Sequence, residues 1–359
     1  MNSPYVLKAK NWFKGAIDRD FLRKIIGTFM TQVVSLGINF LSVIFISRSL
    51  GPVSRGILAT VMAIITLGIQ FGNMGLHASN TYFISKDRSI YSKAVGNSCL
   101  IALVLGGMIS LGVFSFFARN ISENSIRWSD LSLICFWIPI GLAYLLFQNI
   151  LISIHEVKAY NIAEILNKGI GFLTICCIFF LEYRNAEVVL SITLFVQILA
   201  LSYVWVKIKA HLVRGVSLSL SLFKKCLKYG FKSYVGCFSV YLVLKIDLLM
   251  VKHLLGFEEV GYYSVATNMA DLVYIFPTIV ASLLFPRIVP VVDEMERWKI
   301  VKKIAVITFL LMLVIGFVSG LVVKIVVVTL LGEAFAPAVP AFLYLLPGLI
   351  FLSVTSKEK

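Results

Sequence analysis

Residues 25–56 read IIGTFMTQVVSLGINFLSVIFISRSLGPVSRG. The part from 25 to 47 contains no charged residue and is longer than the roughly 20 residues that a helix needs to cross a bilayer core. A polar turn follows, and it contains Gly51 and Pro52, two residue types that interrupt helices. This pattern predicts a transmembrane helix followed by a short loop.

Nine further stretches of similar length and apolarity follow along the chain, at 57–77, 94–118, 129–153, 160–181, 187–206, 233–251, 262–285, 304–323 and 337–354. Of the 359 residues, 59% are hydrophobic and only 14% are charged, whereas soluble domains carry about 25% charged residues. The mean hydropathy is +0.92. The sequence therefore predicts an all-α integral membrane protein with about ten transmembrane helices.

The formal net charge of +15 reflects membrane topology rather than nucleic-acid binding. If the N-terminus lies in the cytosol, 25 of the 33 Lys and Arg residues fall on the inner side and 7 on the outer side. Lys and Arg are enriched in cytoplasmic loops, so this asymmetry places both ends of the chain in the cytosol. Residues 1–24 alternate basic and apolar side chains, which indicates a cytosolic amphipathic segment.

The loops leave little room for an enzyme active site. No predicted outer loop exceeds about a dozen residues, whereas membrane enzymes of polysaccharide synthesis need a sizeable loop or domain for their reacting groups. The His, Cys and Asp residues have no metal-ligand spacing. We therefore expect neither an enzyme nor a bound cofactor.

A short motif repeats in two predicted outer loops. Gly51 and Gly256 are 205 residues apart (256 − 51), and the same shift places Gly56 on Gly261, so both loops read Leu-Gly-x4-Gly. Six predicted helices separate the copies, so both halves enter the membrane in the same direction. This predicts two lobes related by a parallel pseudo-twofold axis, a recurrent transporter design.

The predicted domains are a cytosolic segment (1–24), a six-helix N-lobe (25–209), a basic cytosolic inter-lobe loop (210–232) and a partial C-lobe of four helices (233–359). Two complete repeats would need about 410–430 residues, because repeats contribute equal units. We therefore expect about two helices to be missing from the second lobe, through a fragment, a frameshift or a natural ten-helix form.

Several short motifs occur in the order expected of one transporter family. They are Arg48-x-Leu-Gly51-Pro52-x3-Gly56, Leu227-Lys228-Tyr229-Gly230, Lys245-Ile-Asp247, Leu255-Gly256-x4-Gly261-Tyr262-Tyr263 and Phe285-Pro286. From about residue 21 to 350 the chain resembles the polysaccharide transporter family (O-antigen flippases of the Wzx type) of the multidrug/oligosaccharidyl-lipid/polysaccharide exporter superfamily. The resemblance implies two helical lobes around a central cavity, with members typically having 12 to 14 helices.

Polar residues inside predicted spans are costly, so each needs an explanation. Three spans carry polar side chains at i, i+3 and i+7, which share one helical face. These stripes are Gln32, Ser35 and Asn39; Gln70, Asn73 and His77; and Asn161, Glu164 and Lys168. They predict either a shared hydrophilic cleft or contacts that hold helices together, and Glu164 is placed to pair with Lys168.

Further candidates for the substrate path lie elsewhere in the chain. Lys245 and Asp247 are two residues apart in one span and point about 200° away from each other, so they cannot pair directly. Asp271 lies near the middle of the next span. Arg48 lies at the predicted outer mouth, where an ordinary interfacial arginine is the alternative interpretation.

The resemblance implies a flippase that moves a polyprenyl-pyrophosphate-linked oligosaccharide, an O-antigen or capsule repeat unit, across the bacterial cytoplasmic membrane by alternating access. Membrane lipids, a polysaccharide polymerase and glycosyltransferases are the other implied partners. One alternative is a multidrug antiporter coupled to H⁺ or Na⁺, in which Glu164, Asp247 and Asp271 would bind the cation. Another is a non-transporting scaffold of a polysaccharide assembly complex.

Overall fold

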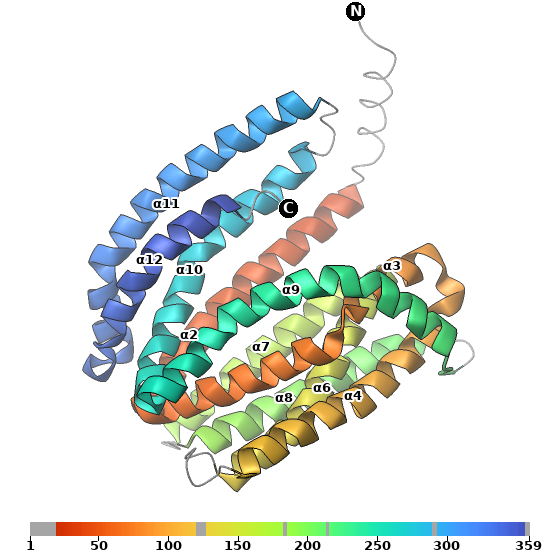
Figure 1. Ribbon diagram of the computed structural model, residues 1–359, viewed down its shortest axis with the longest axis horizontal. Helices are drawn as coiled ribbons and strands as arrows, with labels where there is room; N and C mark the ends of the chain where they lie inside the picture. The colour runs from red at the N-terminus through yellow and green to blue at the C-terminus, as the bar shows by residue number, and fades with distance from the viewer. Residues whose placement is uncertain (1–18, 120–126, 182–184, 213–214, 289–292, 356–359) are drawn as a thin grey trace, which may run out of the picture. The chain divides into compact units, whose positions relative to one another are not determined.

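The computed structural model describes residues 19–119, 127–181, 185–212, 215–288 and 293–355, and these residues form helices and short connections without a strand (Figure 1). The helices are α2 (Arg19–Asn73), α3 (Leu76–Lys86), η1 (Arg88–Ile90), α4 (Tyr91–Arg119), α6 (Trp128–Ser153), α7 (Val157–Phe180), α8 (Ala186–Ala210), α9 (Leu220–Leu255), α10 (Phe257–Ile288), α11 (Glu294–Leu331), η2 (Glu333–Phe335) and α12 (Ala338–Thr355).

The predicted all-α membrane architecture is confirmed. Seven of the described helices are long and apolar enough to cross a membrane, and Ala338–Ser353 is a shorter apolar helix. One of the seven, Met30–Asn73, is 44 residues long and covers most of the first two predicted spans. It is divided by Gly51, whose φ of 69° and ψ of 176° are not helical. Residues 1–18 of the amphipathic segment predicted for 1–24 lie outside the described residues.

Several predicted boundaries differ from the structure, as where α11 begins at Glu294 rather than at 304. The span expected at 57–77 stops at Asn73, because Met74 and Gly75 adopt positive φ angles of 46° and 77°. Helix α9 begins at Leu220, inside the range 210–232 that was expected to be a loop. Ser219 caps this helix, since its side chain accepts a hydrogen bond from the backbone N–H of Leu222 at 3.3 Å.

The described chain forms two compact units by its internal contacts, residues 27–261 and residues 19–26 with 262–355. In the first unit, α6 packs against both α4 and α8, and α7 packs against α8 (Figure 1). The core of this unit is formed by fully buried side chains of α6 such as Ile138, Leu142 and Leu146, together with residues of its neighbours. In the second unit, α11 packs against α12.

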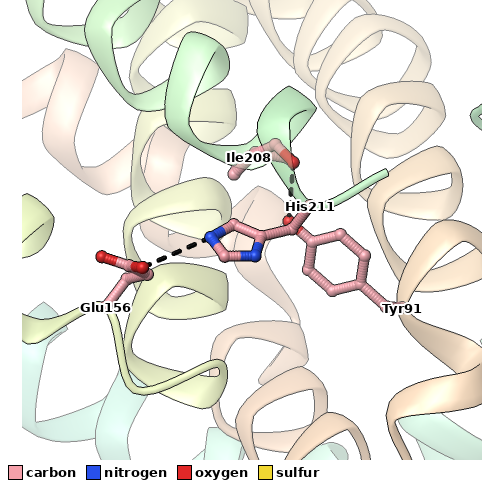
Figure 2. A network of polar contacts seen from close by, with 4 residues as sticks. All are labelled: Tyr91, Glu156, Ile208 and His211. Carbon is pink, nitrogen blue, oxygen red and sulfur yellow. Dashed lines mark hydrogen bonds and ion pairs between the residues drawn. The ribbon is translucent and has the colours of Figure 1, made fainter. Parts of the chain in front are cut away.

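Side-chain contacts connect the ends of α4, α7 and α8 in the first unit, as Figure 2 shows. His211, at the end of α8, lies 3.3 Å from the carboxylate of Glu156, the residue before α7. The hydroxyl of Tyr91, the first residue of α4, donates to the carbonyl oxygen of Ile208 at 3.0 Å. These contacts hold the ends of three helices together.

The segment that leads into α9 lies along α4. Ser217 N–H donates to the carbonyl of Ser92 at 3.3 Å. The side-chain amide of Asn97 donates to the carbonyl of Ser219 and accepts its N–H, at 2.9 and 3.0 Å. Since Leu222 and Cys226 are also buried in the core of the first unit, the start of α9 is packed into this unit.

The two copies of the Leu-Gly-x4-Gly motif pack on each other in the first unit. Their first glycines, Gly51 and Gly256, both have positive φ (69° and 94°) with extended ψ (176° and −177°), a conformation that favours glycine. A side chain at Gly56 would clash with the carbonyl of Phe257, and one at Gly261 would clash with the carbonyl of Pro52.

These two contacts are reciprocal. Adding 205 to Pro52 gives Phe257, and adding 205 to Gly56 gives Gly261, so each contact is the other with its partners exchanged. A twofold relation between two copies requires this exchange, because residue i then contacts j where j contacts i. The repeat predicted from the sequence is therefore matched by the backbone conformation and the packing of the two motifs.

We expect Gly56→Ala and Gly261→Ala each to destabilise the protein by about 1–3 kcal/mol or more, because the added methyl group meets backbone that cannot move independently. Gly37→Ala is the matched control, since nothing lies within 4 Å of its position and alanine favours a helix interior. The measurement is thermal unfolding of the purified protein in detergent. Equal melting temperatures for Gly56→Ala and Gly37→Ala would contradict the packing.

Candidate functional site

A cavity of about 370 Å³ opens between α2 and α7, within the first unit. Seven of its eight lining residues carry a polar group in the side chain, and the lining consists of Thr31, Gln32, Ser35, Leu36, Asn39, Tyr160, Glu164 and Lys168. The first predicted stripe (Gln32, Ser35, Asn39) therefore faces Glu164 and Lys168 of the stripe predicted in the fifth span. Two polar stripes that are more than a hundred residues apart in the sequence form one site.

The carboxylate of Glu164 accepts a hydrogen bond from a buried amide. Gln148, on α6, is 7% exposed, and its Nε2 donates to Glu164 Oε2 at 3.1 Å. The same nitrogen lies 3.1 Å from the hydroxyl of Tyr144, one turn earlier on α6. A carboxylate that accepts a hydrogen bond from a buried amide has a fixed position, so Glu164 presents a defined acceptor to the cavity.

The i+4 spacing of Glu164 and Lys168 permits an ion pair, but none forms between them in the described part of the chain, and both side chains line the cavity. Glu164 is half-buried and is hydrogen-bonded to Gln148, whereas Lys168 is exposed to the cavity. The reason is geometric, because the amide of Gln148 holds the carboxylate toward α6. The ammonium group of Lys168 is thus available to a ligand.

Other polar residues of α7 bind neighbouring helices. Asn161 Nδ2 lies 3.4 Å from the hydroxyl of Thr28 on α2. Asn167 Nδ2 donates to Gln197 Oε1 of α8 at 2.8 Å, and Gln197 is buried. These contacts connect α7 to the helices on both of its sides and so maintain the shape of the cavity.

The stripe predicted in the second span has a different role. Asn73 is 2% exposed, and its Nδ2 lies 2.6 Å from His77 Nδ1, while its Oδ1 accepts the N–H of His77 at 3.2 Å. These bonds bridge the end of α2 and the start of α3. Gln70 is half-buried on α2, and it is not part of the cavity lining.

The remaining predicted residues lie apart from this cavity. Arg48 is exposed on α2, three residues before the interruption at Gly51, and Lys245 and Asp247 are half-buried on α9. Asp247 Oδ1 accepts the N–H of Leu248 at 2.6 Å. Asp271 is exposed on α10, in the second unit. The structure does not bring these four residues into the cavity lining, and their roles stay predictions.

The sequence reasoning missed Thr31, Tyr160 and Gln148. Thr31 and Tyr160 continue the recognised stripes, because Thr31, Ser35 and Asn39, like Tyr160, Glu164 and Lys168, are spaced by four residues. A search at i+4 as well as i+3 would have found them. Gln148 belongs to the amide pair Gln148-Asn149, which lies outside the three recognised stripes, and only the packing of α6 against α7 reveals its partner.

The fold is that of a class of membrane transporters. A multidrug resistance MATE family transporter of the MOP superfamily, in its inward-facing conformation, matches with a TM-score of 0.63 over 93% of this chain and 85% of its own, at 14% identity. An outward-facing conformation of such a transporter matches with 0.60 over 94% and 79%, at 16% identity. A MOP superfamily transporter from Pyrococcus furiosus matches with 0.56 over 94% and 82%, at 15% identity.

The family follows from the sequence comparison. Residues 21–292 match the family of polysaccharide biosynthesis proteins, so the chain belongs to that family. A protein from Shigella flexneri named "Putative O-antigen transporter" is 24% identical over 302 residues, which cover 78% of this chain and 70% of that protein. The family predicted from the Leu-Gly-Pro turn and its companion motifs is confirmed.

We expect the bond between Asn167 and Gln197 to stabilise the helix pair by about 0.6 kcal/mol and at most about 1.7 kcal/mol, the range found for side-chain hydrogen bonds in membrane proteins. A double-mutant cycle with Asn167→Leu and Gln197→Leu, read from unfolding in mixed micelles, measures this coupling. Asn167→Leu combined with Asn97→Ala is the control, because Asn97 bonds Ser219 and shares no partner with Asn167. A coupling equal to the control would refute the contribution.

Proposed function

We propose that the protein is a flippase that moves a polyprenyl-pyrophosphate-linked oligosaccharide from the inner to the outer leaflet of the bacterial cytoplasmic membrane. The family and the transporter fold support this proposal. The single observation that carries it to a site is the polar cavity between α2 and α7. The proposal assigns no catalytic step to the chain.

The depth of the cavity suits the transfer of a polar headgroup. Lys168 lies eleven residues into α7, which begins at Val157, so it is about 16 Å along the helix at 1.5 Å per residue. A bilayer core is about 30 Å thick, so Lys168 would lie close to its middle if the core begins at the start of α7. Transporters of this general design bind their substrates near the midplane.

The charge of the lining favours a saccharide over an amphipathic cation. The cavity holds one carboxylate and one ammonium group, so its formal charge is zero. The Pyrococcus furiosus transporter has a binding pocket of reversed polarity that suggests a different function. If the charge of a pocket reflects the charge of its substrate, an antiporter for cationic drugs would need a net negative cavity. The lining of this cavity does not supply one.

The proposed motion is alternating access, in which the cavity opens first to one side of the membrane and then to the other while the lipid tail stays in the bilayer. An H⁺ or Na⁺ gradient is the proposed source of energy. The carboxylates of Glu164, Asp247 and Asp271 are the candidate sites for the coupling cation.

Lys168→Ala should slow translocation about tenfold without loss of expression, because it removes a charged donor from the cavity while leaving the helix intact. The assay follows a labelled polyprenyl-pyrophosphate oligosaccharide in proteoliposomes that contain the full chain. Lys209→Ala, at the exposed end of α8, is the control. Unchanged transport would remove Lys168 from the mechanism.

The same proteoliposomes distinguish the alternatives. Export of ethidium-type cations, with no movement of the lipid-linked oligosaccharide, would replace the flippase by the antiporter. A chain that transports neither substrate but co-purifies with a glycosyltransferase would be a scaffold.

The proposed orientation places the C-terminal end of the chain in the cytosol and the loop at Glu333 outside, as the distribution of Lys and Arg requires. Alkaline phosphatase is active only outside the cytoplasm. We expect it to be inactive when joined after Lys359 and active when joined after Glu333, with a fluorescent protein giving the opposite pattern. Activity at Lys359 would reverse the orientation.

A further inference from the structure

The cavity lining offers both hydrogen-bond donors and acceptors at short intervals. Gln32 and Asn39 carry amides that do both, Ser35 and Tyr160 carry hydroxyls that do both, and the charged pair adds an acceptor and a donor. A ligand that matches this set must itself donate and accept at many points. Sugar hydroxyls do so, whereas phosphate oxygens only accept when ionised.

Ser35 differs from other hydroxyl residues on its helix. Thr31 donates to the carbonyl of Gly27 at 2.9 Å and Ser42 to that of Ile38 at 2.8 Å, the usual bond of a hydroxyl in a helix. Ser35 lies on the same helix, is 7% exposed and lines the cavity. Its Oγ has no hydrogen-bond partner within the described part of the chain. A buried polar atom left without a partner is costly, and among the described atoms in this condition only the Ser35 hydroxyl belongs to the cavity lining, where a ligand can supply the missing bond.

The two charges of the lining argue against a diphosphate at this place. Its negative charges would approach Lys168 but also the carboxylate of Glu164, which Gln148 holds in position. Charges interact strongly in a partly dehydrated site, and the repulsion would offset the attraction. A neutral ligand meets no such penalty and can hydrogen-bond to both groups.

We propose that the cavity between α2 and α7 is a subsite for an uncharged sugar unit of the lipid-linked oligosaccharide, and that the diphosphate is held elsewhere. The inference rests on the proposed flippase function and assigns the saccharide part of that substrate to named residues. Ser35, Asn39 and Gln32 bind the sugar hydroxyls, and Glu164 and Lys168 act as hydrogen-bonding groups rather than as counter-charges. The volume of the cavity, about 370 Å³, lies at the small end of the range for small-molecule sites.

The two kinds of ligand predict opposite effects of substitution. Lys168→Gln and Glu164→Gln remove charge but keep a polar group of similar length, so binding of a neutral sugar should change by less than about threefold. Asn39→Leu and Ser35→Ala keep the net charge but remove hydrogen bonds. They should weaken binding by about tenfold, because the sugar hydroxyls are left unpaired.

The experiment is saturation-transfer NMR on the purified full chain in detergent. The probes are the methyl glycosides of glucose, galactose, N-acetylglucosamine and rhamnose, with inorganic pyrophosphate as the competitor. We expect saturable binding of at least one glycoside, a tenfold loss in Asn39→Leu and Ser35→Ala, and no displacement by a tenfold excess of pyrophosphate. Ser202→Ala and Lys209→Gln, exposed on α8, are the matched controls.

Three results would overturn the subsite. They are the absence of saturable binding by every glycoside, displacement by pyrophosphate, and a loss in Lys168→Gln as large as that in Asn39→Leu. Glycoside binding without transport in proteoliposomes would instead reject the flippase and leave the sugar subsite standing. Transport without glycoside binding would reject the subsite alone.

Discussion

The reciprocal contact between the two glycine motifs is the constraint on which much of the first unit depends. Gly56 lies against the backbone of Phe257, and Gly261 lies against that of Pro52, so neither position has room for a side chain. Gly51 and Gly256 turn the chain immediately before each contact. A second crossing, where Gly75 and Gly230 also meet backbone to backbone, fixes α9 against the start of α3. Close approach of helix backbones at small residues is a general means of association in lipid, where burial of apolar side chains gives little gain.

Helices fixed in this way can hold polar side chains in the membrane. In lipid an unsatisfied polar group is costly, and the amides of α7 bond neighbouring helices, as Asn167 bonds Gln197. Gln148 is buried inside the bundle and donates a hydrogen bond to Glu164, which lines the cavity. The rigidity of the bundle therefore determines the position of the carboxylate, and the ligand meets a lining that is already formed.

The sequence predicted the helices and the family, and residues from two of the three polar stripes that it identified line the cavity. Long apolar runs leave few alternatives to transmembrane helices, and the glycine motif marked both turns before any contact was known. The sequence could not show that the stripe of Gln32, Ser35 and Asn39 faces α7 rather than the stripe that ends in His77. Periodicity identifies the face of a helix on which residues lie, but it does not identify the helix that packs against this face. It also left open whether Glu164 and Lys168 form an ion pair, which their i+4 spacing permits, because it had no means of weighing the competing bond from Gln148.

That competing bond changes the chemical meaning of the site. Two charges that neutralise each other would leave a lining of hydroxyls and amides alone, whereas two charges held apart remain individually available to a ligand. A highly charged ligand gains from one group and loses to the other, but a neutral polyhydroxyl ligand gains hydrogen bonds from both. The hydroxyl of Ser35 on the facing helix can both donate to and accept from a sugar hydroxyl, whereas an ionised diphosphate oxygen would use it only as a donor. For the proposed flippase, the separation of these two charges therefore supports a saccharide rather than a diphosphate as the group bound between α2 and α7.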